Sequence, residues 1–183
     1  EAQWAPAFGL SVGDYDGDGH EALFVSQNFF ATNLDSERRD AGRGLWLRGD
    51  GKGGLKPVPG HESGVQVYGE QRGCALGDFN ADGRIDLVVT QNGATTKLYR
   101  NIGAKPGLRV RLRGAGGVNS SAIGATMRLV YGDRSGPVRE VRSGSGYWSQ
   151  DSAVQVLGVN GSATQVWVRW PGGATTTTEL PSA

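Results

Sequence analysis

The feature that most constrains this chain is a pair of acidic loops 64 residues apart. Asp14–Gly19 (DYDGDG) recurs as Asp78–Gly83 (DFNADG), and each copy precedes a run typical of a β-strand. At this offset, Gly9–Asn28 and Gly73–Asn92 are identical at nine of twenty positions without a gap. The chain therefore contains an internal repeat of several strands, as in propeller blades and related β-arrays.

Each copy predicts a short strand, the acidic loop and a second strand, at Leu23–Ser26 and at Leu87–Thr90. Further along, Gly44–Arg48 resembles Thr96–Arg100, and each segment precedes a turn. The 31 glycines follow no three-residue period, and long amphipathic helical patterns are absent. The sequence therefore predicts an all-β protein. No apolar run of about 18 residues is present, so we expect no membrane span.

The second loop carries oxygen ligands at alternating positions. Side-chain oxygens come from Asp78, Asn80, Asp82 and Asp86, and the backbone carbonyl of Arg84 adds another. Calcium (Ca²⁺) takes six to eight oxygen ligands, and water can complete this set. The twelfth position is a valine where an EF-hand needs a carboxylate. The sequence therefore predicts a calcium loop between strands and not an EF-hand.

The first loop has the same pattern with one ligand fewer. Asp14, Asp16 and Asp18 supply carboxylates and His20 a backbone carbonyl, but the ninth position is Ala22. We therefore rank the second loop as the more complete site. The first loop binds calcium more weakly, recruits water, or takes an oxygen from elsewhere.

The alternative explanation of both loops is that Asp-Gly and Asn-Gly pairs simply form turns. Turns alone do not explain three or four acidic positions within one short loop. Repulsion between these like charges destabilises a fold unless a cation neutralises them. Magnesium is less suitable, because it keeps more water and fewer protein ligands.

The segments Phe8–Leu10 and Gly13–Gly19 together resemble the FG-GAP/VCBS repeat of integrin-like β-propellers, and Gly77–Leu87 resembles it more closely. A second set of segments is similar to the ASPIC/UnbV domain: Arg109–Gly114, Ala122–Ala125, Arg139–Tyr147 and Val168–Pro171. The combination resembles the C-terminal end of proteins of the cartilage acidic protein family.

The resemblance implies two propeller-blade-like calcium-loop repeats in residues 1–103, with motifs at 8–28 and 72–92. A β-sandwich-like ASPIC/UnbV module follows in residues 104–183, and Gly103–Gly107 forms the joint. Propellers close with about four to eight blades. Two copies alone cannot close; unless further blades precede residue 1 in a longer product, their open edges favour a homo-oligomer or a filament.

Charge is unevenly distributed along the chain. Residues 1–100 hold 14 acids and 10 bases, a net of −4, whereas residues 101–183 hold 4 acids and 9 bases, a net of +5. Opposite charges favour contact between the two parts, within or between chains. Arg109, Arg111 and Arg113 alternate without interleaved aromatic residues, so the sequence does not favour a nucleic-acid partner.

These observations predict an extracellular calcium-binding structural or adhesive protein that self-associates. The chain begins at Glu1, so we expect a removed signal peptide or a longer product. The alternative is a module of a larger secreted protein that binds a glycan or a cell-surface protein, with Tyr147, Trp148 and Trp167 as candidate contacts. With two histidines and no zinc-type spacing, we do not expect an enzyme.

Overall fold

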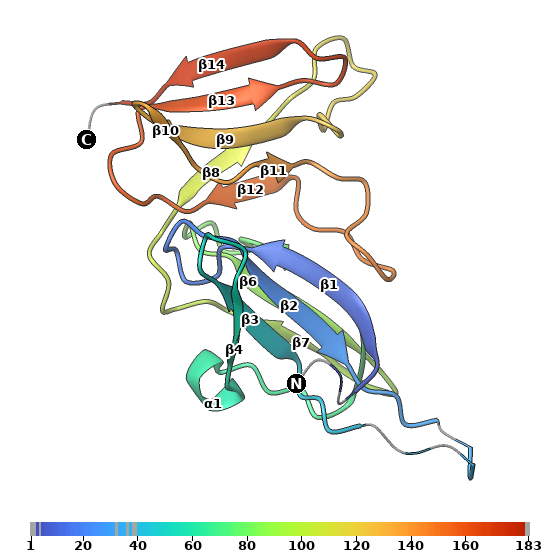
Figure 1. The fold of residues 1–183 in the computed structure, drawn as a ribbon. Coiled ribbons are helices and arrows are strands. Elements are labelled where there is room, and N and C mark those ends of the chain that lie inside the picture. The colour runs from blue at the N-terminus through green and yellow to red at the C-terminus, as the bar shows by residue number, and fades with distance from the viewer. Residues whose placement is uncertain (1–2, 4, 32, 36, 38–39, 182–183) are drawn as a thin grey trace.

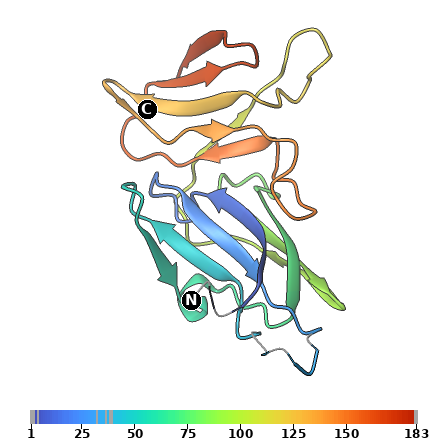
Figure 2. The same cartoon turned by 45° about the vertical axis from the view of Figure 1, so that its right-hand side comes forward.

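The computed structural model describes residues 3, 5–31, 33–35, 37 and 40–181. Its regular structure is almost all strand, as predicted, and the exception is the one-turn helix α1 (Gly60–Ser63). Two parts lie one above the other: a repeat region before residue 104 and a C-terminal module after it (Figure 1, Figure 2). Within the described residues, no helix is long and apolar enough to cross a membrane.

The first repeat forms a four-stranded antiparallel sheet in which each strand pairs with the next, the form of a propeller blade. Its strands are β1 (Ala7–Gly13), β2 (Ala22–Gln27), β3 (Leu45–Gly49) and β4 (Leu55–Val58). The second repeat forms a three-stranded sheet of the same type from β5 (Glu70–Gly77), β6 (Asp86–Asn92) and β7 (Ala94–Tyr99). Among the described residues, this sheet has no counterpart of β4.

The two sheets repeat each other down to single hydrogen bonds. In each sheet, the register of the first two strands shifts at an equivalent glycine, which is Gly9 in the first sheet and Gly73 in the second. The N–H of Gly9 donates to the Ser26 hydroxyl at 2.7 Å, and that of Gly73 donates to the Thr90 hydroxyl at 2.9 Å. The sequence repeat therefore corresponds to a structural repeat, and each copy has a β-bulge at the equivalent glycine.

The core of the repeat region lies between these two sheets. Phe24 is fully buried, and its ring packs edge-on against Trp46. Trp46 also stacks on Tyr15 from the first loop, with ring centroids 4.3 Å apart. Leu87 and Val89 contribute from the second repeat, so both blades share one core.

The C-terminal module is built from two sheets around a second core, the sandwich-like arrangement that the sequence predicted. One sheet has the order β10-β9-β13-β14, with β11 also paired to β9, and the other pairs β12 with β8. The strands are β8 (Leu108–Arg111), β9 (Thr126–Tyr131), β10 (Arg134–Ser135), β11 (Arg139–Glu140), β12 (Val154–Leu157), β13 (Gln165–Arg169) and β14 (Thr175–Glu179). Met127 and Val168 from the first sheet pack with Leu157 from the second.

Strand β12 belongs to both cores. Val156 packs into the core of the repeat region, whereas its neighbour Leu157 packs into that of the C-terminal module. Successive residues of a strand point to opposite faces, so one strand can serve two layers. The segment 103–107 is correspondingly packed: the N–H of Lys105 donates to the Asp16 carbonyl at 3.4 Å, and that of Gly107 to the Gly83 carbonyl at 2.7 Å. The joint lies against both acidic loops.

Candidate metal centre

The two acidic loops connect β1 to β2 and β5 to β6, and they share three internal hydrogen bonds. The carboxylates of Asp14 and Asp78 accept the N–H groups of the residues four and five positions later, at 2.8–3.1 Å. Asp18 and Asp82 each accept the N–H two positions later, at 2.8 and 3.0 Å. The glycine that ends each loop has a positive φ, 88° in the first and 81° in the second. The repeated sequence therefore gives the same turn twice.

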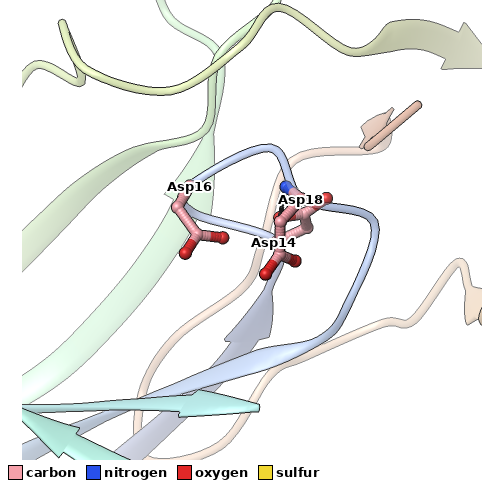
Figure 3. Close-up of side chains that lie close together, drawn as sticks. All are labelled: Asp14, Asp16 and Asp18. Atoms are coloured by element: carbon pink, nitrogen blue, oxygen red, sulfur yellow. Dashed lines mark hydrogen bonds between the residues drawn. The ribbon is translucent and has the colours of Figure 1, made fainter. Parts of the chain in front are cut away.

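Three carboxylates converge in the first loop. One oxygen each from Asp14, Asp16 and Asp18 lies within 4.8 Å of the others, and Figure 3 shows the three side chains along one turn of the chain. Among the described residues, this is the one such group of three His, Cys, Asp or Glu side chains. His20 follows directly and donates its N–H to Asp18 at 2.8 Å.

The charge of this group is only partly balanced within the chain. Arg48, in β3, lies 2.7 Å from Asp16 through its Nε atom. It is the one cationic side chain that an ion pair joins to the three carboxylates in the described part of the chain. Three ionised carboxylates and one guanidinium leave a formal charge of −2, which a divalent cation would cancel.

Asp14 is the most buried member of the group, with 5% of its surface exposed. Burial raises the pKa of its carboxyl to about 6, the Gly19 N–H opposes this rise, and the charges of Asp18 and Asp16 add to it. In the absence of a cation, the fold therefore disfavours the ionised form of Asp14. The residues present fit a calcium ion, which would favour that form.

The C-terminal module covers the first loop at Asp14 and Gly19, and the repeat itself supplies no ninth ligand. Ala22 is buried and offers no side-chain oxygen. Gly158 lies so near Asp14 that a methyl group built on it would overlap the carboxylate. Asn160 lies beside Gly19 in the same way, so residues 158–160 close the loop from the outside.

The second loop has a different electrostatic setting. The Asp78 side chain is fully buried, and the Nε atom of Arg109, from β8, lies 2.7 Å from its Oδ2 atom. Asp86, the predicted ninth ligand, accepts the N–H of Asn101 at 2.7 Å and that of Phe79 at 3.1 Å. Both carboxylates are therefore already bound to groups of the protein.

Asp82 is also bound by neighbouring groups. It accepts the side-chain amide of Asn80 at 2.9 Å, and guanidinium nitrogens of Arg84 and Arg100 lie 3.3 and 3.8 Å away. The Asn80 amide first, and then the backbone N–H and charge of Arg84, hold the pKa of Asp82 below its usual value. The second loop thus has three carboxylates and three arginines, a formal charge of zero.

The structure brings together the predicted residues of the first loop, but not those of the second, into one carboxylate group. The sequence-based ranking counted ligands, Asn80 among them, and placed the second loop ahead; the group of three close carboxylates lies in the first. Sequence reasoning missed Arg48, Gly158 and the role of Arg109. Arg109 was visible only as part of an alternating basic run, and no spacing rule connects it with Asp78.

Comparison with known families agrees with this organisation. The model of the FG-GAP-like repeat matches residues 14–89, and that of the ASPIC and UnbV domain matches residues 115–183. No curated protein matches the chain. The two matches have the order that the sequence motifs predict, and each falls on one of the two parts of the fold. The chain therefore consists of an FG-GAP-like repeat region followed by an ASPIC and UnbV domain.

Proposed function

We propose that this chain is an extracellular calcium-stabilised structural or adhesive protein, with a structural role rather than an enzymatic one. FG-GAP-like repeats and ASPIC and UnbV domains are typical of extracellular proteins. The observation that carries the proposal is the convergence of Asp14, Asp16 and Asp18 with a formal charge of −2. Millimolar free calcium outside cells makes even a modest site useful there.

Calcium fits this group better than other cations. Carboxylate and carbonyl oxygens suit a hard cation, and the flexible geometry of Ca²⁺ tolerates an incomplete set that water completes. Asp14, Asp16 and Asp18 would hold the ion, and the His20 carbonyl is the remaining candidate from the sequence. The ion would stabilise the β1–β2 loop, against which the joint and the C-terminal module pack.

Terbium luminescence tests the site directly, because Tb³⁺ replaces Ca²⁺ at oxygen sites and is excited by a nearby aromatic ring. Tyr15 lies within the loop and stacks on Trp46. We expect sensitised emission that Ca²⁺ suppresses and that Asp16→Asn reduces. Asp133→Asn, in the exposed turn after β9, is the matched control and keeps the emission. Equal emission from the two variants would rule out the first loop as the terbium-binding site.

Self-association is supported by the open edges of the two blades. In the part of the chain that the structure describes, β4 and β7 pair with no further strand on their outer sides. Five of the six residues of β7 are exposed, including the apolar Leu98. Unpaired strand edges are templates for a further strand.

Sedimentation velocity over a range of protein concentrations tests this part of the proposal. We expect the sedimentation coefficient to rise with concentration in calcium, and Leu98→Lys to weaken that rise. A monomer at the highest concentration would contradict self-association.

The second candidate function is recognition of a glycan or of a cell-surface protein. Trp148 is 91% exposed and holds a positive φ of 47°, and Tyr147 lies beside it. Trp167 is less available, because the Arg128 guanidinium lies 4.6 Å from its ring centroid. Glycan-array binding that Trp148→Ala abolishes and Trp167→Ala preserves would favour this function over a purely structural one.

A further inference from the structure

The second loop contains a buried charge that the C-terminal module balances. The side chain of Asp78 has no exposed surface, and burying a carboxylate is costly unless it is paired and hydrogen-bonded. Two backbone N–H groups of the loop and the Arg109 guanidinium supply these partners. Asp14, at the equivalent position of the first loop, has the backbone bonds, but Gly158 lies beside it in place of an arginine.

The rest of the second loop leaves little for a metal ion. The carboxylate of Asp82 is bound by Asn80, Arg84 and Arg100, and that of Asp78 by Arg109. A divalent ion placed among three guanidinium groups would be repelled by them. The residues of the second loop therefore do not fit calcium as those of the first loop do.

Arg109 is held in place by the architecture of both parts. It lies in β8, where it is paired with Val156 of β12, and Val156 is buried in the core of the repeat region. Two neighbouring bonds run across the same boundary. The Gly107 N–H donates to the Gly83 carbonyl, and the Arg84 Nε donates to the Ala104 carbonyl, both at 2.7 Å.

We propose that Arg109 supplies the cation of the second loop in place of calcium, so that this loop serves to dock the C-terminal module onto the repeat region. The duplicated loops have thus diverged: one is a metal site and the other an internal ion-pair contact. The chain then binds one calcium ion and not two, a number that rests on the proposed function of the first loop.

Calorimetric titration of the full chain with Ca²⁺ tests the stoichiometry. We expect one ion per chain, lost in Asp16→Asn and kept in Asp78→Asn. Two ions per chain, with one lost in Asp78→Asn, would overturn the proposal.

A double-mutant cycle in EDTA tests the docking contact without calcium. Arg109→Met should lower the melting temperature by roughly 6–20 °C, because it leaves a buried carboxylate without its counter-ion. It should lower it much less in the Asp78→Asn background, where that charge is absent. Arg111→Met, an exposed arginine two residues along β8, is the matched control and should act independently of Asp78→Asn. Additive effects of Arg109→Met and Asp78→Asn would contradict the proposal.

The two experiments separate this proposal from the proposed calcium role. Absence of calcium binding together with non-additive effects at Asp78 and Arg109 would contradict the calcium role of the first loop and support the docking role of Arg109.

Discussion

At the scale of single residues, the two loops show how the side chains around a repeated turn decide its role. Asp14 and Asp78 both accept the N–H groups of the residues four and five positions later, and Asp14 also accepts that of Gly17. Asp78 has Arg109 against its carboxylate, whereas Asp14 has the bare backbone of Gly158. Under the proposed function, the first carboxylate would be neutralised by a bound cation, whereas the second is neutralised by Arg109.

The raised pKa of Asp14 predicts how the stability of the metal-free protein depends on pH. The pKa of the Asp14 carboxyl is about 6 in the folded state and 3.8 for an unperturbed Asp, which represents the unfolded chain. The folded state therefore binds the proton more tightly than the unfolded state. This contribution to stability is complete below about pH 4 and is lost as the pH rises through about 6. Burial also raises the pKa of Asp151, which acts in the same direction.

In EDTA, the melting temperature should therefore fall between pH 5 and pH 7, and the fall should be smaller in Asp14→Asn. Saturating calcium should remove the part due to Asp14, because the ion favours the ionised carboxylate. A melting temperature that rises over this interval in EDTA would contradict the assignment.

Gly158 predicts a test of how the C-terminal module closes the first loop. A methyl group on Gly158 would overlap Asp14 Oδ2, so Gly158→Ala should shift the 158–160 segment away from the loop. We expect a loss of about 1–3 kcal/mol in the free energy of unfolding and weaker calcium binding. Gly103→Ala, with open space around it, is the control for both urea unfolding and calcium titration. Equal effects of the two substitutions would show that the closure is unimportant.

At the scale of elements, the sequence pattern predicted the positions of those strands that are determined by local interactions. The strands β2 and β6 lie where Leu23–Ser26 and Leu87–Thr90 predicted them, because alternation and flanking turns are visible in the sequence. The resemblance of the two third strands is also confirmed: Leu23 pairs with Leu47, and Leu87 pairs with Tyr99.

What the sequence could not predict depends on contacts between distant segments. The grouping of Asp14, Asp16 and Asp18 depends on one short segment, so the sequence pattern could predict it. The Arg109–Asp78 contact joins residues of different modules, and the sharing of β12 between two cores depends on how those modules pack. Neither leaves a periodic signal in the sequence.

Strand β12 predicts that the two parts unfold together. Val156→Ala removes buried volume from the repeat core, and Leu157→Ala removes it from the other. Each should cost roughly 2–4 kcal/mol, and each should lower the midpoint of one common urea transition, followed by both near- and far-ultraviolet circular dichroism. Two separate transitions, each moved by only one of the substitutions, would show independent units.

At the scale of the whole molecule, the acidic loops lie at the boundary between the two parts. The joint at 103–107 contacts both loops, and residues 158–160 cover the first. The acidic repeat region and the basic C-terminal module meet there, as the uneven charge of the sequence suggested. Calcium at the first loop and Arg109 at the second would fix the same interface from two points.

The most direct test of this account is thermal unfolding of the full chain in EDTA and in saturating Ca²⁺. A ligand that binds only the folded state at about 100 times its Kd adds about 2.7 kcal/mol. For a chain of this size, that corresponds to a rise of about 5–10 °C in the melting temperature. We predict this rise for the wild type, its loss in Asp16→Asn and its retention in Asp133→Asn. Superimposable melting curves of the wild type with and without calcium would contradict the account.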